Sequence, residues 1–500
     1  MTDKVAIHRL ETGVPGLDLL LGGGLPECSF NLIAGSPGSG KTTLAHQIMF
    51  ALAKPDRRAL YFTVLGEPPL KMLRYQQQFT FFDVDKVNGS IRFVNLADEA
   101  LHGDFDRILG RIQREIETDS PALVVVDSFR SVMLSARNES DGAVALQHFV
   151  QQLGMYLTSW QATTFLVGEY ELSVSETNPV LTVADGLIWL TQHVYRESMV
   201  RKIEVKKMRG QRTLPGLHTF RINDDGVDVF PRAIIGAGIP PERPVDGGRR
   251  ALKRLSLGVP RLDTMLGGGL PEGYSLLVAG PAGSGKTILA THFLAEGVRQ
   301  GERGVIAAFE KNPSQSQNPV LDQLVRAGDV GVIDTRSLDL SIDVTLNDLS
   351  HMIRRLQAKR VVIDSLSGYE LALAPTDSAN FRDSLYRMVA VLTSMGVTVL
   401  MTSELEDRYT DLRFSPHGTA FLTDAIIVQR YIEVESRLKR IMAVVKVRGS
   451  AHSDELHLFE ITGEGIVIGE PLAEYQGLLS GQPAMRAMKR PTGRGGGTKR

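Results

Sequence analysis

Cysteine is almost absent from this chain of 500 residues, in which Cys28 stands alone. One cysteine excludes an intrachain disulfide framework and fits a reducing compartment, so we expect a cytoplasmic protein. Runs of about 18 apolar residues are also missing, and the sequence therefore predicts no membrane span. The first ten residues carry charged side chains in place of an apolar stretch, so we expect no signal peptide.

An excess of charge of either sign is lacking as well. The chain holds 56 basic and 57 acidic residues, which gives a formal net charge of −1. Proteins that attract nucleic acid through a global field usually have a basic excess, so such binding would need a local patch here. Hydrophobic residues make up 43% of the chain, an ordinary value for packed domains, which excludes a wholly disordered protein.

The chain contains a long internal repeat. Residues 9–45 and 254–290 are identical at 24 of 37 positions, without a gap, at an offset of 245 residues. Such identity indicates a tandem duplication, and a period of this length corresponds to a whole domain rather than a solenoid repeat. The predicted parts are a first domain over 1–232, a linker rich in glycine and proline over 233–250, a second domain over 251–475 and a basic, disordered end over 476–500.

Each copy alternates short apolar runs with helical segments such as Gly142–Trp160 and Ser378–Met395. Apolar runs of this length are typical of strands buried on both faces, and helices between them imply a parallel sheet. We therefore predict an α/β fold of two tandem domains, each a mostly parallel sheet flanked by helices. The predicted strands are Ser29–Ala34, Leu60–Leu65, Leu123–Val126, Thr163–Val167, Ser275–Ala279, Val305–Phe309, Arg360–Ile363 and Val397–Met401.

Two glycine-rich motifs, GSPGSGKT at 35–42 and GPAGSGKT at 280–287, fit the pattern GxxxxGK[ST]. Each follows an apolar run and opens a predicted helix, the context that a phosphate-binding loop requires. Glycines let backbone N–H groups approach phosphates, and Lys41 and Lys286 would reach the β- and γ-phosphates. The predicted nucleotide-binding residues are Gly35, Ser36, Pro37, Gly38, Ser39, Gly40, Lys41, Thr42, Thr43, Gly280, Pro281, Ala282, Gly283, Ser284, Gly285, Lys286, Thr287 and Ile288.

Magnesium ligands are predicted from the same arrangement. Thr42 and Thr287 supply the hydroxyl that coordinates Mg²⁺ in such loops. Asp127 and Asp364 each end an apolar run, where ligands bind in open α/β sheets, and a carboxylate there suits a magnesium site. A helix N-cap is the alternative role, because a serine follows each aspartate.

The motifs stand in a context that resembles the KaiC family of RecA-like ATPases. GVPGLDLLLGGGLP at 13–26 and GVPRLDTMLGGGLP at 258–271 each run into a phosphate-binding loop, and the resemblance extends over residues 7–485. YQGLLSGQPAM at 475–485 is similar to the family's C-terminal loop segment. The resemblance implies two RecA-like P-loop NTPase domains that use ATP and Mg²⁺ and stack as rings in a homohexamer, with ATP between neighbouring subunits.

Two short basic motifs match the family's KxRG motif. They are KMRG at 207–210 and KVRG at 446–449. By the resemblance, their cations would reach the γ-phosphate held by a neighbouring subunit, where they stabilise the charge that develops in phosphoryl transfer. A solvated basic strand end is the alternative. The residues concerned are Lys207, Arg209, Lys446 and Arg448.

The family carries adjacent glutamates after the strand that follows the phosphate-loop helix, and one polarises the attacking water. The second copy keeps Glu310 and has Lys311 at the second position. At the ungapped offset, Leu65 stands opposite Glu310, whereas a gap of one residue would align Glu67 with the second glutamate. We predict Glu310 as the general base of the second copy and retain Glu67 as a candidate in the first.

The family's autokinases phosphorylate adjacent Ser/Thr residues just before a strand that Thr-Asp introduces. Here that stretch is PHGTAFLTD at 416–424, in which Thr419 is the nearest upstream hydroxyl and Ala420 and Phe421 cannot accept phosphate. The paired site is therefore expected to be lost. Ser/Thr autokinase activity would depend on Thr419.

The resemblance implies an ATP-hydrolysing hexamer that regulates protein partners, as in circadian clocks. A RecA- or helicase-type DNA motor is an alternative, but residues 173–183 carry one acid and no base, and 406–419 mixes acids with two arginines. Channel loops that bind DNA need basic residues, so we expect no nucleic-acid partner. A nucleotide-gated scaffold with little turnover is the other alternative, because the paired glutamates are altered.

Overall fold

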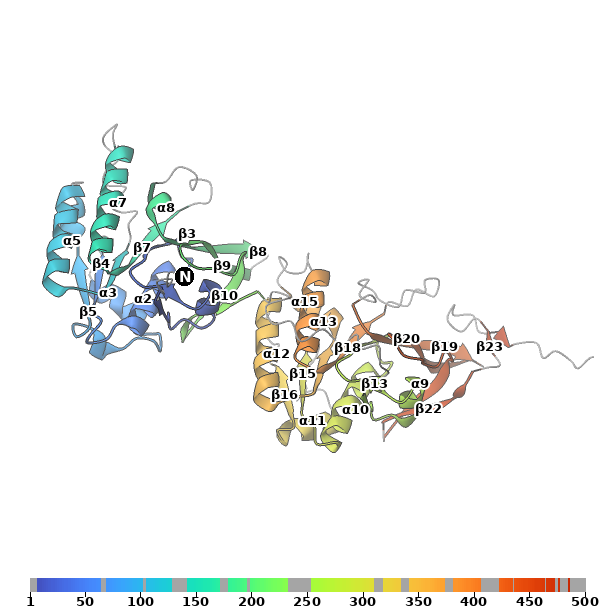
Figure 1. Ribbon diagram of the computed structural model, residues 1–500. Helices are drawn as coiled ribbons and strands as arrows, with labels where there is room; N and C mark the ends of the chain where they lie inside the picture. The colour runs from blue at the N-terminus through green and yellow to red at the C-terminus, as the bar shows by residue number, and fades with distance from the viewer. Residues whose placement is uncertain are drawn as a thin grey trace, which may run out of the picture. The chain divides into compact units, whose positions relative to one another are not determined.

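A computed structural model of the chain divides into two compact units, Met1–Arg232 and Ala233–Arg500 (Figure 1). Each unit is built around one nine-stranded sheet. The residues that the structure describes are 7–63, 69–101, 105–127, 142–170, 179–195, 198–232, 253–309, 318–333, 341–373, 381–405, 422–434, 436–463, 465–472, 475–476 and 484–485.

The sheet of the first unit has the strand order β11-β10-β9-β8-β3-β7-β6-β4-β5. Strands β8 to β5 in this order are parallel, and β9, β10 and β11 continue the sheet as an antiparallel ribbon. The sheet strands are β3 (Phe30–Gly35), β4 (Ala59–Thr63), β5 (Ile91–Asn95), β6 (Leu123–Asp127), β7 (Thr163–Glu169), β8 (Gly186–Tyr195), β9 (Ser198–Met208), β10 (His218–Asn223) and β11 (Gly226–Phe230). A separate two-stranded sheet pairs β1 (Arg9–Leu10) with β2 (Leu25–Pro26).

Helices cover both faces of this sheet. One face packs against α2, and its core includes Leu44, Ile48 and Tyr61; the other packs against α5 and α7, and its core includes Ile112 and Leu153. The strands between the two layers are buried at nearly every position, as a sheet covered on both faces requires. The helices are α1 (Leu17–Leu21), α2 (Lys41–Leu52), α3 (Pro69–Gln76), α4 (Ala97–Leu101), α5 (Phe105–Asp119), α7 (Gly142–Ser159) and α8 (Pro179–Val183), with a 3-10 turn at Val84–Lys86.

The second unit repeats this plan, with the strand order β16-β15-β17-β18-β14-β19-β20-β21-β22. Its strands are β14 (Ser275–Gly280), β15 (Gly304–Ala308), β16 (Val330–Ile333), β17 (Arg360–Asp364), β18 (Thr398–Glu404), β19 (Ala425–Val434), β20 (Arg437–Val447), β21 (His457–Thr462) and β22 (Gly465–Pro471), besides the short pairs β12 (Arg254–Leu255) with β13 (Leu270–Pro271) and β23 (Tyr475–Gln476) with β24 (Ala484–Met485). Its helices are α9 (Pro260–Met265), α10 (Lys286–Arg299), α11 (Pro319–Arg326), α12 (Ile342–Leu356), α13 (Leu366–Ala372) and α15 (Phe381–Ser394).

These sheets confirm the predicted fold class, because each is mostly parallel and flanked by helices. The predicted strands and helices occur, with ends that differ by a few residues. The predicted strand at Thr163–Val167, for example, continues to Glu169, and its counterpart at Val397–Met401 begins at Thr398 and continues to Glu404. No helix among the described residues is both long and apolar enough to cross a membrane.

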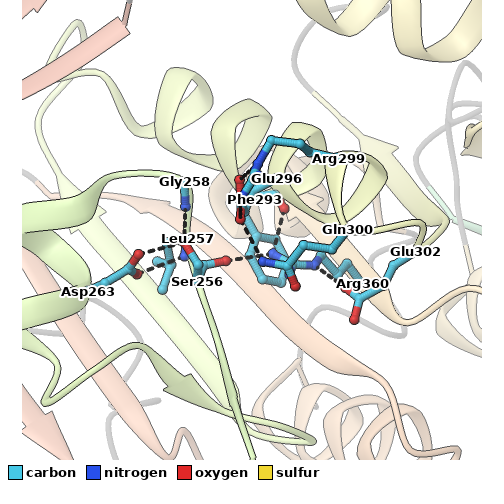
Figure 2. Close-up of polar contacts among 10 residues, drawn as sticks. All are labelled: Ser256, Leu257, Gly258, Asp263, Phe293, Glu296, Arg299, Gln300, Glu302 and Arg360. Carbon is cyan, nitrogen blue, oxygen red and sulfur yellow. Dashed lines mark hydrogen bonds and ion pairs between the residues drawn. The ribbon is translucent and has the colours of Figure 1, made fainter.

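A buried ion network anchors strand β17 in the second unit (Figure 2). The side chain of Arg360, 1% exposed, donates through Nε to Glu302 Oε2 at 2.7 Å and through Nη1 to the carbonyl oxygens of Ser256 and Phe293 at 2.7 and 2.9 Å. Its guanidinium also lies over the Phe293 ring, 4.8 Å from the centroid. Because β17 begins at Arg360 and ends at Asp364, the network fixes the far end of the strand that carries a predicted magnesium ligand.

Candidate phosphate and magnesium sites

Both predicted phosphate-binding loops connect a buried central strand to a helix N-terminus. The first leaves β3 at Gly35 and enters α2 at Lys41; the second leaves β14 at Gly280 and enters α10 at Lys286. The residue before each helix is a glycine in the left-handed region, with φ 98° and 99°. A Cβ on Gly40 would lie 2.6 Å from Ile222 Cδ1, so both the conformation and the close packing require glycine here.

The two lysines of the loops point back over their own loops. Lys41 Nζ donates to the carbonyl oxygen of Ser36 at 2.8 Å. Lys286 Nζ donates to the carbonyl oxygens of Gly280 and Pro281, both at 2.8 Å. Each ammonium group therefore lies inside the curve of the loop, where it would meet the phosphates of a bound nucleotide.

The structure brings the predicted magnesium ligands together in each unit. Thr42 Oγ1 donates to Asp127 Oδ2 at 2.8 Å, and Thr287 Oγ1 donates to Asp364 Oδ2 at the same distance. A hydroxyl and a carboxylate oxygen are hard donors that Mg²⁺ accepts together with water and phosphate oxygens. The donor set of both units therefore fits Mg²⁺.

Further polar groups that the sequence analysis missed hold these carboxylates. Tyr61 OH donates to Asp127 Oδ2 at 2.7 Å, and Thr402 Oγ1 donates to Asp364 Oδ1. Burial raises the pKa of Asp127, and the hydrogen bonds from Tyr61 and Thr42 and the charge of Lys41 oppose this effect. Each carboxylate is thus oriented by its neighbours rather than free to rotate.

Two glutamates at the same edge of the sheets were also missed. In the strand registers, Glu169 is paired with Gly35 and Glu404 with Gly280, so each lies beside the first glycine of a phosphate loop. The negative charge of Glu169 contributes to the raised pKa of Asp127. The signal was present in the sequence, since an acid recurs at the end of corresponding apolar runs in both copies.

In each sheet the KxRG motif lies at the end of the strands opposite to the phosphate loop. Arg209 Nη1 bonds Asp185 Oδ1 at 3.0 Å, and Lys207 Nζ donates to the carbonyl oxygens of Leu181 and Thr182 at 3.4 and 3.2 Å. Burial lowers the pKa of Lys207, as does the nearby charge of Arg209. These cations are held by residues just before β8, and not by the phosphate loop of the same unit.

The second unit repeats this arrangement. Lys446 Nζ donates to Thr423 O at 2.7 Å, and Arg448 Nη1 lies 3.4 Å from Asp424 Oδ1. Burial lowers the pKa of Lys446, with Arg448 adding to the effect. Both arginines keep more than half of their side-chain surface exposed, at 60% for Arg209 and 56% for Arg448.

Several predicted residues lie outside the described residues. They include the general-base candidates Glu310 and Glu67, the intervening Leu65 and the phosphate-acceptor candidate Thr419. The linker at 233–250 also falls outside the described part of the chain. Among the residues that are described, no cluster of three or more His, Cys, Asp and Glu side chains could hold a metal ion.

Known proteins are similar in sequence to this chain over nearly its whole length. The "Circadian clock oscillator protein KaiC" of Picosynechococcus is 27% identical, with 96% of this chain and 93% of the relative covered. The "Circadian clock protein KaiC3" of Synechocystis is also 27% identical, over 96% of this chain and 95% of that protein. The family described as "ATPase: KaiC" matches twice, at residues 10–234 and 255–473, once in each unit. The chain therefore belongs to the KaiC family of P-loop ATPases.

Proposed function

We propose that this chain is an ATP-hydrolysing regulator that works as a ring-shaped homohexamer, with ATP bound between neighbouring subunits. In this proposal the loops at 35–43 and 280–288 bind the phosphates of one ATP each. The KxRG cations of one subunit act on the nucleotide of the next.

One observation carries the proposal: in each unit the phosphate loop and the KxRG motif lie at opposite ends of the strands. Arg209 N donates to Asp185 O, and Phe30 N donates to Asp185 Oδ2, so Arg209 is level with the first residue of β3. Gly35, the last residue of β3, begins the phosphate loop. Five residues of strand span about 17 Å, which is too far for Arg209 to contact a phosphate in its own loop.

The second unit has the same separation. Arg448 N donates to Asp424 O, and Asp424 Oδ2 accepts from Ser275 N at the start of β14. Gly280 ends β14 and begins the second phosphate loop. An exposed arginine held at the strand ends opposite to the phosphate loop of its own unit is suited to a site on another subunit.

The residues of each unit would divide the work at the nucleotide. Lys41 and Lys286 hold the β- and γ-phosphates, and the loop N–H groups bind their oxygens. Thr42 with Asp127, and Thr287 with Asp364, would hold Mg²⁺, which neutralises phosphate charge when bound. Arg209 and Arg448, with Lys207 and Lys446, would stabilise the charge that develops at the neighbour's γ-phosphate.

Carboxylates outside the described residues complete the proposal. Glu310 would take a proton from the attacking water in the second unit. Glu67 would do so in the first only if the loop between β4 and α3 aligns with a one-residue gap. Autophosphorylation would use Thr419, which has no adjacent hydroxyl acceptor at 420 or 421.

The output of the hexamer would be control of protein partners. The curated relatives are named circadian clock proteins, and the similarity covers more than nine tenths of this chain and of each relative. We therefore propose a clock-type signalling role, in which ATP turnover changes the surface offered to regulatory partners.

The test measures native mass and phosphate release on one sample of the full chain, with and without Mg·ATP. The proposal predicts hexamers and phosphate release that depend on Mg·ATP. Monomers at micromolar protein and saturating Mg·ATP would contradict it. Hexamers without phosphate release would favour a nucleotide-gated scaffold, and acceleration by single-stranded DNA would favour a DNA motor.

A mixing experiment tests the action between subunits. Arg209→Ala alone should lower first-domain hydrolysis, measured in a Lys286→Ala background that removes the second site. Mixing this variant with Lys41→Ala protein in the same Lys286→Ala background should restore hydrolysis, because some interfaces then combine an intact loop with an intact arginine. Arg212→Ala, an exposed arginine three residues further on, is the control and should hydrolyse normally. Absence of restoration would contradict action in trans.

A further inference from the structure

The carboxylate of Asp127 is held by a different residue from the one that holds its counterpart Asp364. In the first unit, Tyr61 OH donates to Asp127 Oδ2, the same oxygen that accepts from Thr42. In the second unit, Thr402 donates to Asp364 Oδ1, the oxygen that does not accept from Thr287.

The strand registers show that the hydroxyl bonded to the aspartate comes from a different strand in each unit. Tyr61 lies two residues before the β4 residue that pairs with Asp127, and the equivalent residue of β15 is Ile306. Thr402 is paired with Val278 of β14, and the equivalent residue of β7, paired with Ile33, is Val167. The first unit thus has a hydroxyl where the second has isoleucine, and valine where the second has a hydroxyl.

The ring of Tyr61 is fixed by its surroundings. Its side chain is fully buried, its ring stacks on His46 with centroids 4.6 Å apart, and Phe93 packs against it at 5.3 Å. His46 lies one helical turn after Thr42 on α2, so the ring that packs on Tyr61 belongs to the helix that carries Thr42. Burial raises the pKa of Tyr61 well above its ordinary value, so its phenol remains a donor.

We propose that Tyr61 is a positioning residue of the first nucleotide site, which holds Asp127 in the orientation that Mg²⁺ requires, and that Thr402 performs this role in the second site. The inference rests on the proposed magnesium role of Asp127. Partners that orient a metal ligand typically change metal affinity by about 10- to 100-fold when they are removed. The two sites therefore respond to different single substitutions.

Tyr61→Phe tests the proposal, because it removes the hydroxyl and keeps the ring that packs on His46 and Phe93. The parent is the full chain with Lys286→Ala, so that only the first site binds nucleotide. Equilibrium binding of ATP is measured in EDTA and at increasing Mg²⁺. We expect the gain in ATP affinity that Mg²⁺ causes to fall by about 10- to 100-fold, with unchanged affinity in EDTA.

Two further variants sharpen the result. Tyr156→Phe is the matched control, because the Tyr156 hydroxyl also lies against a carboxylate, 3.3 Å from Glu117, but away from the site. It should leave the Mg²⁺ gain unchanged. Adding Val167→Thr to Tyr61→Phe installs the hydroxyl of the second unit, and it should restore most of the gain because Val167 is paired with Asp127 in the sheet.

The outcomes separate this inference from the proposed function. A parent protein without any Mg²⁺ gain would refute the magnesium role of Asp127 and the inference with it. A parent that shows the gain and a Tyr61→Phe variant that matches it would overturn the inference alone. An equal loss of affinity in EDTA and in Mg²⁺ would also overturn it, because that is the effect of a structural defect. If Val167→Thr restores none of the Mg²⁺ gain, the inference that a threonine hydroxyl at this strand position can replace the Tyr61 hydroxyl is wrong.

Discussion

Buried His46 should make the stability of the first unit depend on pH. Its side chain is fully buried on α2, where its ring stacks on the ring of Tyr61. Burial lowers the pKa of His46 to about 3, against an opposing effect of the Gln76 side chain. The imidazole is therefore neutral in the folded unit at pH values well above 3.

The sign and size of the effect of pH on the stability of the first unit follow from proton linkage. Below about pH 6.5 the unfolded chain binds a proton at this position and the folded unit does not, so stability falls as the pH falls. Each pH unit below 6.5 lowers the free energy of unfolding by about 1.4 kcal/mol, so the loss is about 2 kcal/mol at pH 5. The loss continues until the pH reaches the folded value near 3. For a unit of this size, about 2 kcal/mol corresponds to roughly 4–8 °C in Tm.

The assay uses His46→Leu, which removes the titrating group at similar volume. Both tryptophans, Trp160 and Trp189, lie in the first unit, so thermal unfolding followed by tryptophan fluorescence reports on that unit within the full chain. The Tm of the parent minus that of His46→Leu should decrease by roughly 4–8 °C between pH 7.5 and pH 5. Ile48→Val, a change on the same helix that adds no titrating group, should give an offset that is constant with pH.

A difference between parent and His46→Leu that stays constant from pH 7.5 to pH 5 would refute this reasoning. It would mean that the imidazole gains its proton in the folded unit as easily as in the unfolded chain. The ring nitrogens of His46 would then have access to water or to a proton acceptor.

Other predictions concern the two sites and the buried ion pair. Lys41→Ala and Lys286→Ala should each halve the number of ATP molecules bound per chain at equilibrium; loss of both sites from either change would show that they depend on each other. Glu310→Gln, with Lys41→Ala, should slow phosphate release by roughly 10²–10⁴-fold while nucleotide stays bound, and an unchanged rate rules out this base. Arg360→Leu should destabilise the second unit by about 3–5 kcal/mol, because Glu302 keeps its charge. Replacing Glu302 by leucine as well should recover most of that loss in thermal unfolding, and a double variant as unstable as the single one would contradict the pairing.

The sequence by itself determined the duplication, the fold class and the placement of the two glycine-rich loops between a strand and a helix. Identity at a constant offset shows the repeat without any structure, and GxxxxGK[ST] between an apolar run and a helix is a local pattern. Asp127 and Asp364 were also predictable, because an acid that ends a buried strand must lie at the edge where the loop lies. The pairing with Thr42 and Thr287 follows from that placement.

Only the tertiary structure decided which groups act on those carboxylates. Tyr61 is 66 residues from Asp127 and Thr402 is 38 residues from Asp364 in the sequence. The sheet order brings each hydroxyl within hydrogen-bond distance of its own aspartate. Local pattern could not reveal this, because an apolar run with one tyrosine or threonine is typical of any buried strand. The distance between the KxRG motif and the phosphate loop has the same origin, since it depends on the order and direction in which the strands are hydrogen-bonded.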